Sequence, residues 1–195
     1  AKYVQSDYSH KFNALGFKHE VLGGIDAAHE DFNNFSATAL TKARTTVGTP
    51  NDGAGVDESL RVISKNREFT AKGMGVYAQD LVQIAPMWKL LGGLRWDQFQ
   101  GDYLAVAASG NPNQVVNGVT YPNPCYVPAN SRLQRDDSLW SKRMGVLFQP
   151  TPYSSYHLSY ATSFNTAGDA YQYDPGTSNT DPESSRNIEL GAKLD

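Results

Sequence analysis

The sequence predicts an all-β chain that forms an antiparallel, up-and-down segment of a transmembrane β-barrel. Three observations support this prediction. Apolar and polar side chains alternate with a period of two along several segments, and no segment of useful length carries a helical period. The connections between these segments alternate between short and long, which is the pattern that distinguishes the two ends of an outer-membrane barrel.

The alternation is clearest in residues 75–99. Successive strand residues point to opposite faces of a sheet, so each run has an apolar face and a polar face. Pro86 has no amide hydrogen and lies between the two runs, where it favours a tight turn. The segment therefore predicts a hairpin of strands at 75–84 and 88–97. In the second strand the apolar set is Trp88, Leu90, Leu94 and Trp96, and the polar set is Lys89, Gly93, Arg95 and Asp97.

Further segments alternate in the same way, at residues 3–12, 17–26, 140–149, 155–164 and 187–194. Residues 13–16 join the first two segments and residues 150–153 join the third and fourth, so each pair predicts another hairpin. The chain is thus expected to contribute about seven strands to an antiparallel sheet.

The connections predict how this sheet is oriented. Turns near 13–16, 85–87 and 150–153 are short, whereas those near 33–68, 105–138 and 166–185 run to roughly 20 residues or more, far above the usual length in compact domains. Outer-membrane barrels have short periplasmic turns and long extracellular loops, with apolar side chains facing lipid and polar ones facing the lumen. Because bacterial single-chain barrels close with an even number of strands, an odd number predicts a piece of a larger barrel.

Composition limits the classes of function. The chain of 195 residues is 39% apolar with a net charge of −3, which argues against a nucleic-acid partner. No apolar run approaches the roughly 20 residues of a membrane-spanning helix. Two functions compatible with this composition are those of a passive porin-like channel and of a secreted β-sandwich that binds glycans.

The sequence predicts no catalytic centre, no metal site and no resident cofactor. The G-x-S-x-G motif of a nucleophilic serine is absent. The histidines are far apart and lack carboxylate or cysteine neighbours at the spacing of metal ligands. They are His10, His19, His29 and His157. The chain is therefore expected not to be an enzyme.

Motifs in these strands resemble those of TonB-dependent siderophore receptors of the ferrichrome and catecholate group. The hairpin at 75–99 is similar to a strand with the pattern G-x-Y-x-Q-D followed by a strand ending in G-x-R-x-D. The strands around it match in the same order along the chain. The matching residues are Lys18, His19, Gly24 and Asp26, then Gly75, Tyr77, Gln79, Asp80, Gly93, Arg95 and Asp97, then Ser141, Arg143, Gly145, Pro150, Ser159, Tyr160, Ser163 and Phe164, and last Pro182, Glu183, Glu189, Gly191 and Lys193.

This resemblance implies the function of the whole protein. Residues 1–195 would be part of a barrel of about 22 strands that encloses a plug domain, with the plug and the barrel termini outside this segment. The receptor would lie in the bacterial outer membrane, contact its lipid, and import a ferric siderophore with energy from the TonB protein. The siderophore's own oxygens would hold the iron, so the protein would need no cofactor.

Two groups of residues are candidates for function. Aromatic and basic side chains in the long connections are expected to contact an anionic iron chelate, because aromatic rings stack on it and guanidinium groups pair with it. These residues are Tyr121, Tyr126, Arg132, Arg135, Tyr171 and Tyr173. The polar phase of the strands is expected to form a charge network in the lumen from Arg95, Asp97 and Arg143.

Overall fold

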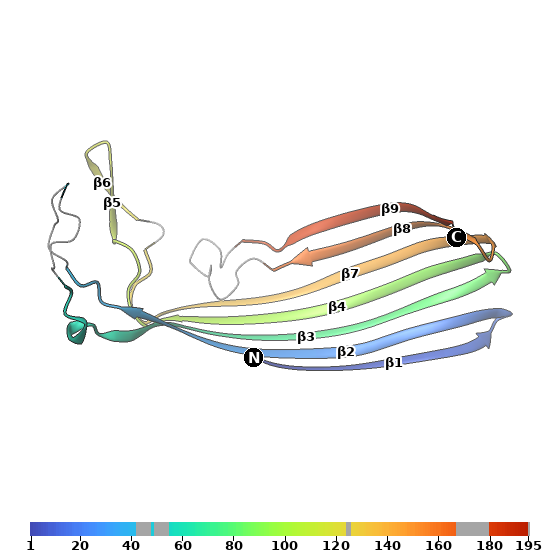
Figure 1. Cartoon of the computed structure of the whole chain (residues 1–195), viewed down its shortest axis with the longest axis horizontal. Helices are drawn as coiled ribbons and strands as arrows, with labels where there is room; N and C mark the ends of the chain where they lie inside the picture. Colours follow the sequence, from blue (N-terminus) through green and yellow to red (C-terminus); the bar gives the residue numbers. More distant parts are fainter. Residues whose placement is uncertain (42–47, 49–54, 124–125, 167–179, 195) are drawn as a thin grey trace.

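One curved antiparallel sheet makes up most of the computed structural model, which describes residues 1–41, 48, 55–123, 126–166 and 180–194 (Figure 1). The strands run β1-β2-β3-β4-β7-β8-β9 across the sheet, so each strand pairs with its neighbour in the chain apart from the excursion between β4 and β7. This order confirms the predicted up-and-down segment of seven strands. The strands are β1 (Lys2–Ala14), β2 (Phe17–Ala37), β3 (Ile63–Ala85), β4 (Trp88–Ala105), β7 (Ser131–Thr151), β8 (Ser154–Asn165) and β9 (Glu183–Leu194).

The excursion between β4 and β7 contains a small hairpin that the strand prediction missed. It consists of β5 (Asn113–Val116) and β6 (Val119–Pro122), which pair with each other in a separate two-stranded sheet. Asn117 and Gly118 connect them with positive φ angles of 53° and 81°. Asn-Gly is the preferred sequence for a two-residue hairpin turn, because both positions require positive φ. The dipeptide was therefore a readable signal in the sequence.

Short turns and long connections lie at opposite ends of the sheet, as predicted (Figure 1). The turns at residues 15–16, 86–87 and 152–153 lie at one end. At the other end lie the β5–β6 hairpin and a short 3-10 helix, η1 (Glu58–Leu60). Beside η1, the guanidinium of Arg61 donates to Glu58 at 2.8 Å and lowers the pKa of that carboxyl.

The strands are longer than predicted on the loop side. β2 continues to Ala37, β3 begins at Ile63, β4 continues to Ala105 and β7 begins at Ser131. The predicted bounds 33–68 and 105–138 are therefore wrong, and the connections are 38–62 and 106–130. At 18 to 23 residues, the strands β2, β3, β4 and β7 are about twice as long as the 9–11 residues that cross a membrane.

Two rows of aromatic side chains mark an apolar band on the convex face of the sheet. Trp88 is registered with Phe148, and Phe148 with Tyr156, and their rings stack with centroids 4.4 and 6.3 Å apart. Eight residues further along β4 and β7, Trp96 is registered with Trp140, which is 63% exposed. Eight strand residues span about 26 Å along the strand, which at the usual strand tilt of about 35–45° corresponds to about 20 Å along the membrane normal, somewhat less than the roughly 25 Å apolar band of outer-membrane barrels.

The apolar face changes sides beyond the second aromatic row. Within the band, exposed apolar residues such as Leu94 and Met144 lie on the convex face. Further toward the loops this face becomes polar, with Gln100 donating to Asp136 at 3.0 Å. The opposite, concave face there holds a buried cluster. Its members are Phe69, Ala71, Tyr103, Ala105 and Val127, with Phe32, Phe99 and Leu133 packed against it.

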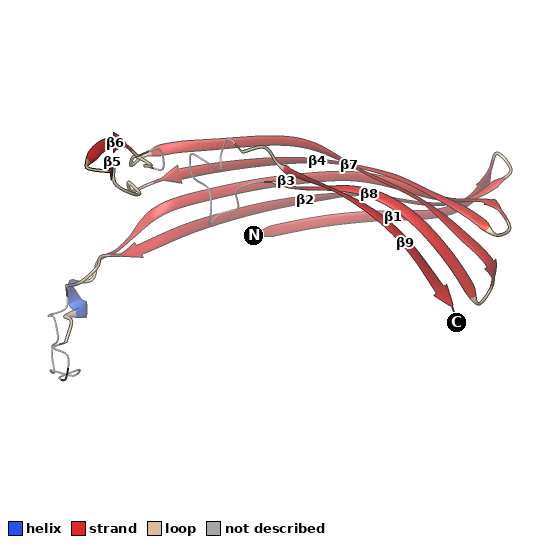
Figure 2. Cartoon of the chain, turned by 90° about the horizontal axis from the view of Figure 1, so that it is seen from above, coloured by secondary structure: helices blue, strands red, loops and turns tan. Residues whose placement is uncertain are grey.

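The arrangement of the sheet distinguishes the predicted barrel segment from the alternative of a β-sandwich. A β-sandwich would place Trp88, Leu90, Leu94 and Trp96 between two facing sheets. The described residues instead form one curved layer with Trp88, Leu90 and Leu94 exposed on it (Figure 2). The β-sandwich alternative is therefore wrong. Among the described residues, no helix has the length and apolar character needed to cross a membrane.

Candidate functional site on the concave face

The concave face carries an arginine held between two carboxylates. Arg95 of β4 donates through Nη1 and Nη2 to the two oxygens of Asp26 of β2, at 2.8 and 3.1 Å. It also donates through Nε and Nη2 to Asp97, two residues along its own strand, at 2.9 and 2.6 Å. Bidentate arginine–carboxylate contacts are the strongest charge-assisted hydrogen bonds in proteins. The cluster therefore ties β2 to β4 across β3.

Aromatic and amide groups extend this cluster toward β1. The guanidinium carbon of Arg95 lies 5.4 Å from the centre of the Tyr77 ring, within range of a cation–π interaction. The Tyr77 hydroxyl donates to Asp7 of β1, and Gln5 donates to the same carboxylate at 2.9 Å. Four neighbouring strands thus share one connected polar network, named here the Arg95 network.

Glycines make room for the Arg95 network. Gly75 lies on β3 between Asp26 and Asp97 in the strand register. A Cβ at Gly75 would lie inside van der Waals distance of the Arg95 guanidinium and 2.9 Å from the Asp26 carboxylate. The absent side chain therefore lets the arginine cross β3 and reach its partner on β2.

We predict that Gly75→Ala displaces the Arg95 guanidinium and destabilises the protein by about 1–2 kcal/mol. This value is well below that for a fully buried ion pair, because about a third of the Arg95 side chain is exposed. Thermal unfolding of the intact barrel, followed by its mobility on gels without boiling, measures the loss. Gly73→Ala is the matched control, since its Cβ would meet only the Ala28 Cβ at 3.9 Å. Equal losses in the two variants would contradict the prediction.

The predicted lumen residues separate into two sets. Arg95 and Asp97 are in contact, and Asp26 completes their cluster. Arg143 lies on the same concave face, registered with Gly93 and Ala161, but makes no ion pair with a described residue. The sequence signal for Asp26 was its place in the polar phase of β2. The functional role of this set stays a prediction.

The predicted ligand contacts do not form one group. Arg132 and Arg135 lie within β7 and not in the long connection, so their predicted placement in a loop is wrong. Arg132 is on the convex face and donates to Asp102 at 2.8 Å. Arg135 is on the concave face, 8% exposed and paired with Asp137. Their separation follows from the odd spacing of three residues in a strand, which puts side chains on opposite faces.

The predicted tyrosines lie nearer the loop end. Tyr121 is in β6 and is 49% exposed, whereas Tyr126 is half-buried beside Val127. Tyr171 and Tyr173 lie outside the described residues.

Val127 pairs with Ser109 in an isolated bridge and packs into the buried cluster, which anchors the base of the connection between β4 and β7.

The middle of the concave face is an open hollow of about 530 Å³. Its lining is mostly polar and draws on all seven strands of the main sheet. Among the lining residues are Gln5, Asp26, Tyr77, Arg95, Arg143 and Glu189. Among the described residues there is no group of three or more His, Cys, Asp or Glu side chains that could hold a metal ion. Such a surface can form hydrogen bonds and ion pairs with a polar occupant.

Comparison with protein families matches residues 2–195 to the model described as "TonB dependent receptor-like, beta-barrel". The chain belongs to this family. The match covers the whole sheet, so the resemblance that the strand motifs indicated is confirmed. It also favours a receptor barrel over the passive porin-like channel.

The chain shares modest sequence identity with individual members of the TonB-dependent receptor family. The chain is 26% identical over 135 residues to the probable TonB-dependent siderophore receptor PiuA of Acinetobacter baumannii, covering 66% of this chain and 16% of PiuA. It is 31% identical over 126 residues to the probable TonB-dependent receptor BfrD of Bordetella pertussis, covering 62% of this chain and 15% of BfrD. The match therefore spans about a sixth of the length of these relatives.

Solved structures of receptors share the fold. The crystal structure of the siderophore receptor PiuA superposes with a TM-score of 0.70 at 19% identity, over 99% of this chain and 29% of that one. The closed form of the ferric-catecholate import receptor Fiu from E. coli gives 0.67 at 18% identity, over 98% of this chain and 28% of that one. The sheet thus corresponds to less than a third of a receptor chain, which explains why it is open at both edges.

Proposed function

We propose that this chain is part of an outer-membrane receptor that imports a ferric siderophore with energy supplied by the TonB protein. Membership of the TonB-dependent receptor family is the observation that carries this proposal. The relatives named above are receptors and importers, so we infer a transporter and not an enzyme. A ferric catecholate is the preferred cargo, since Fiu is named for that ligand class.

The geometry of the sheet supports different roles for its concave face and for the connections at its loop end. The polar concave face would contact a plug domain supplied by another part of the receptor, and the Arg95 network would keep that wall rigid. The connections at the loop end would meet the chelate first. The siderophore would hold its iron throughout, so the described residues act by binding and orienting an anionic complex, and no cofactor is required.

Binding and uptake by the intact receptor test this function. We expect the purified receptor to bind a ferric catecholate, measured by quenching of tryptophan fluorescence. We also expect cells that carry it to take up radioactive iron from that complex only when TonB is functional. Absence of affinity for any ferric siderophore, catecholate or hydroxamate, would overturn the proposal.

We predict that Tyr121→Ala weakens binding of the ferric catecholate by about two- to tenfold, because stacking on one aromatic ring contributes about 0.5–1.5 kcal/mol. Tyr121 is suited to this contact by its exposure on the β5–β6 hairpin at the loop end. Tyr153→Ala is the matched control, since Tyr153 is an exposed tyrosine in the turn between β7 and β8 at the opposite end. Unchanged affinity in the Tyr121 variant would remove the hairpin from the ligand site.

A further inference from the structure

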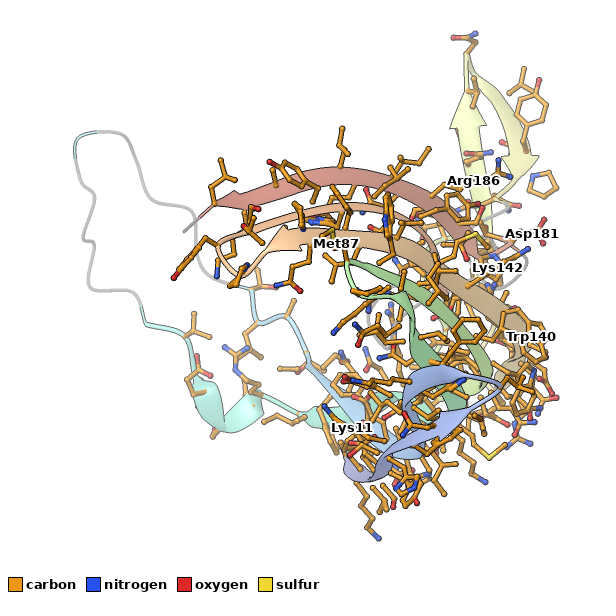
Figure 3. The ribbon with its side chains drawn as sticks, turned by 90° about the vertical axis from the view of Figure 1, so that its right-hand side faces the viewer. Lys11, Met87, Trp140, Lys142, Asp181 and Arg186 are labelled. Carbon is orange, nitrogen blue, oxygen red and sulfur yellow. The ribbon has the colours of Figure 1, made fainter. Side chains whose placement is uncertain are left out.

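The turn of the β5–β6 hairpin carries a dipeptide with a chemical reactivity of its own. Asn117 and Gly118 form this turn, and they are the single Asn-Gly sequence in the chain. Figure 3 shows the hairpin, in pale yellow, standing clear of the main sheet. Every residue from Asn113 to Pro122 is exposed. Neither the Arg95 network nor the proposed contact at Tyr121 uses this turn.

The two groups that can react with each other are both free in the described part of the chain. The Asn117 carboxamide forms no hydrogen bond with another described residue, and the Gly118 amide donates to none. Both residues have positive φ, and Gly118 has no Cβ to shield its amide nitrogen. The Asn117 side chain and the amide nitrogen that follows it are therefore unhindered.

The hairpin is also weakly held. Its strands have four residues each, and among the described elements β5 and β6 contact only each other. A single two-stranded hairpin is at best marginally stable in water. The turn can therefore open without disturbing the main sheet. In the open form the peptide between Asn117 and Gly118 is able to rotate until the Gly118 nitrogen faces Cγ of Asn117.

We propose that Asn117 is a site of spontaneous deamidation. The Gly118 nitrogen attacks Cγ of Asn117, a C–N bond forms, and the side-chain nitrogen leaves as ammonia with the proton of the attacking amide. Water then opens the cyclic imide at either carbonyl, so the net reaction consumes water, releases an equal amount of ammonia and needs no oxidant or reductant. Opening at Cγ gives aspartate. Opening at the main-chain carbonyl gives isoaspartate, in which the backbone contains an extra methylene group.

Both products alter the hairpin that carries Tyr121. Each adds a negative charge where the proposed function places contact with an anionic chelate. Isoaspartate in addition lengthens the backbone of the turn, and the length of the turn sets the pairing of Val116 with Val119. Deamidation would therefore weaken ligand capture as the receptor ages. This consequence rests on the proposed function, whereas the reaction itself does not.

Peptide mass spectrometry of the intact receptor, after incubation in neutral buffer for several days, tests the reaction. We expect the peptide with Asn117 to gain the mass difference between NH2 and OH and to contain isoaspartate, which electron-transfer fragmentation distinguishes from aspartate. Asn130 is the matched internal control. It is also exposed with a positive φ of 60°, but the amide that follows it, that of Ser131, donates to Pro128 at 3.4 Å. Deamidation of Asn117 that is undetectable, or no faster than that of Asn130, would overturn the site.

Asn117→Asp tests the consequence separately, because it introduces the charge without the reaction. We expect this variant to weaken binding of a ferric catecholate by about two- to fivefold, the effect of one exposed charge. Asn13→Asp is the control, since Asn13 is exposed at the opposite end of the sheet. Unchanged affinity in Asn117→Asp would overturn the consequence for binding. Deamidation of Asn117 in a receptor that binds no siderophore would support the site and refute the proposed function.

Discussion

Replacing Met144 by arginine is expected to destabilise the intact receptor by about 2–4 kcal/mol, the cost of a basic side chain at the lipid-facing midplane of a barrel. Met144 is 52% exposed on the convex face and is registered with Gly92, midway between the two aromatic rows. No partner in hydrocarbon would neutralise the new charge. Urea-dependent folding of the receptor into lipid vesicles measures the loss.

The control for this substitution is Ser159→Arg on the opposite face. Ser159 is registered with Gly145, the residue after Met144, and it lines the polar hollow. A guanidinium there meets polar side chains and water, so its effect should stay below about 1 kcal/mol. Equal losses from the two arginines would show that the convex face does not contact lipid.

The second large effect is expected from Tyr103→Ala, which should destabilise the loop-side half of the sheet by about 3–5 kcal/mol, as other removals of buried aromatic rings do. Tyr103 is 2% exposed in the buried cluster with Phe69 and Val127. Loss of the ring should release Val127, and with it the base of the connection at 106–130. Hydrogen exchange and limited proteolysis of the intact receptor should therefore show faster opening of that connection.

Two variants control for the position and the chemistry of this change. Tyr103→Phe keeps the ring volume and should cost less than about 1.5 kcal/mol. Leu104→Ala truncates the next residue, which points to the convex face outside the cluster. If Leu104→Ala opened the connection as much as Tyr103→Ala, the buried cluster would not be what anchors it.

The sequence allowed the turn-side half of the sheet to be predicted well. There, most of the apolar residues of strands such as β4 fall in one phase, so a period of two identifies both the strand and its lipid face. The short turns at Pro86 and near residue 152 set the hairpin pairing. The charge network was partly readable for the same reason, because Arg95 and Asp97 share the polar phase.

The loop-side half could not be predicted in the same way. Phe99 and Tyr103 are apolar but lie on the phase opposite to Trp96, so an analysis that follows one phase ends β4 too early. The partners of Arg132 and Arg135 depend on pairing between strands distant in sequence. Asp102 lies 30 residues from Arg132, and no local pattern connects them.

The change of apolar face along the strands has a mechanical consequence for the whole barrel. A sheet with one uniform apolar face could slide along the membrane normal at little cost. In this sheet, inward movement by two residues would carry Gln98 and Ser138 into the apolar band, whereas outward movement would expose the row of Trp96 and Trp140 to water. The bilayer must therefore adapt its local thickness to the distance between the two aromatic rows. We expect the surrounding membrane to be thinned to match the protein, which keeps the loop-side extension at a constant height above the lipid.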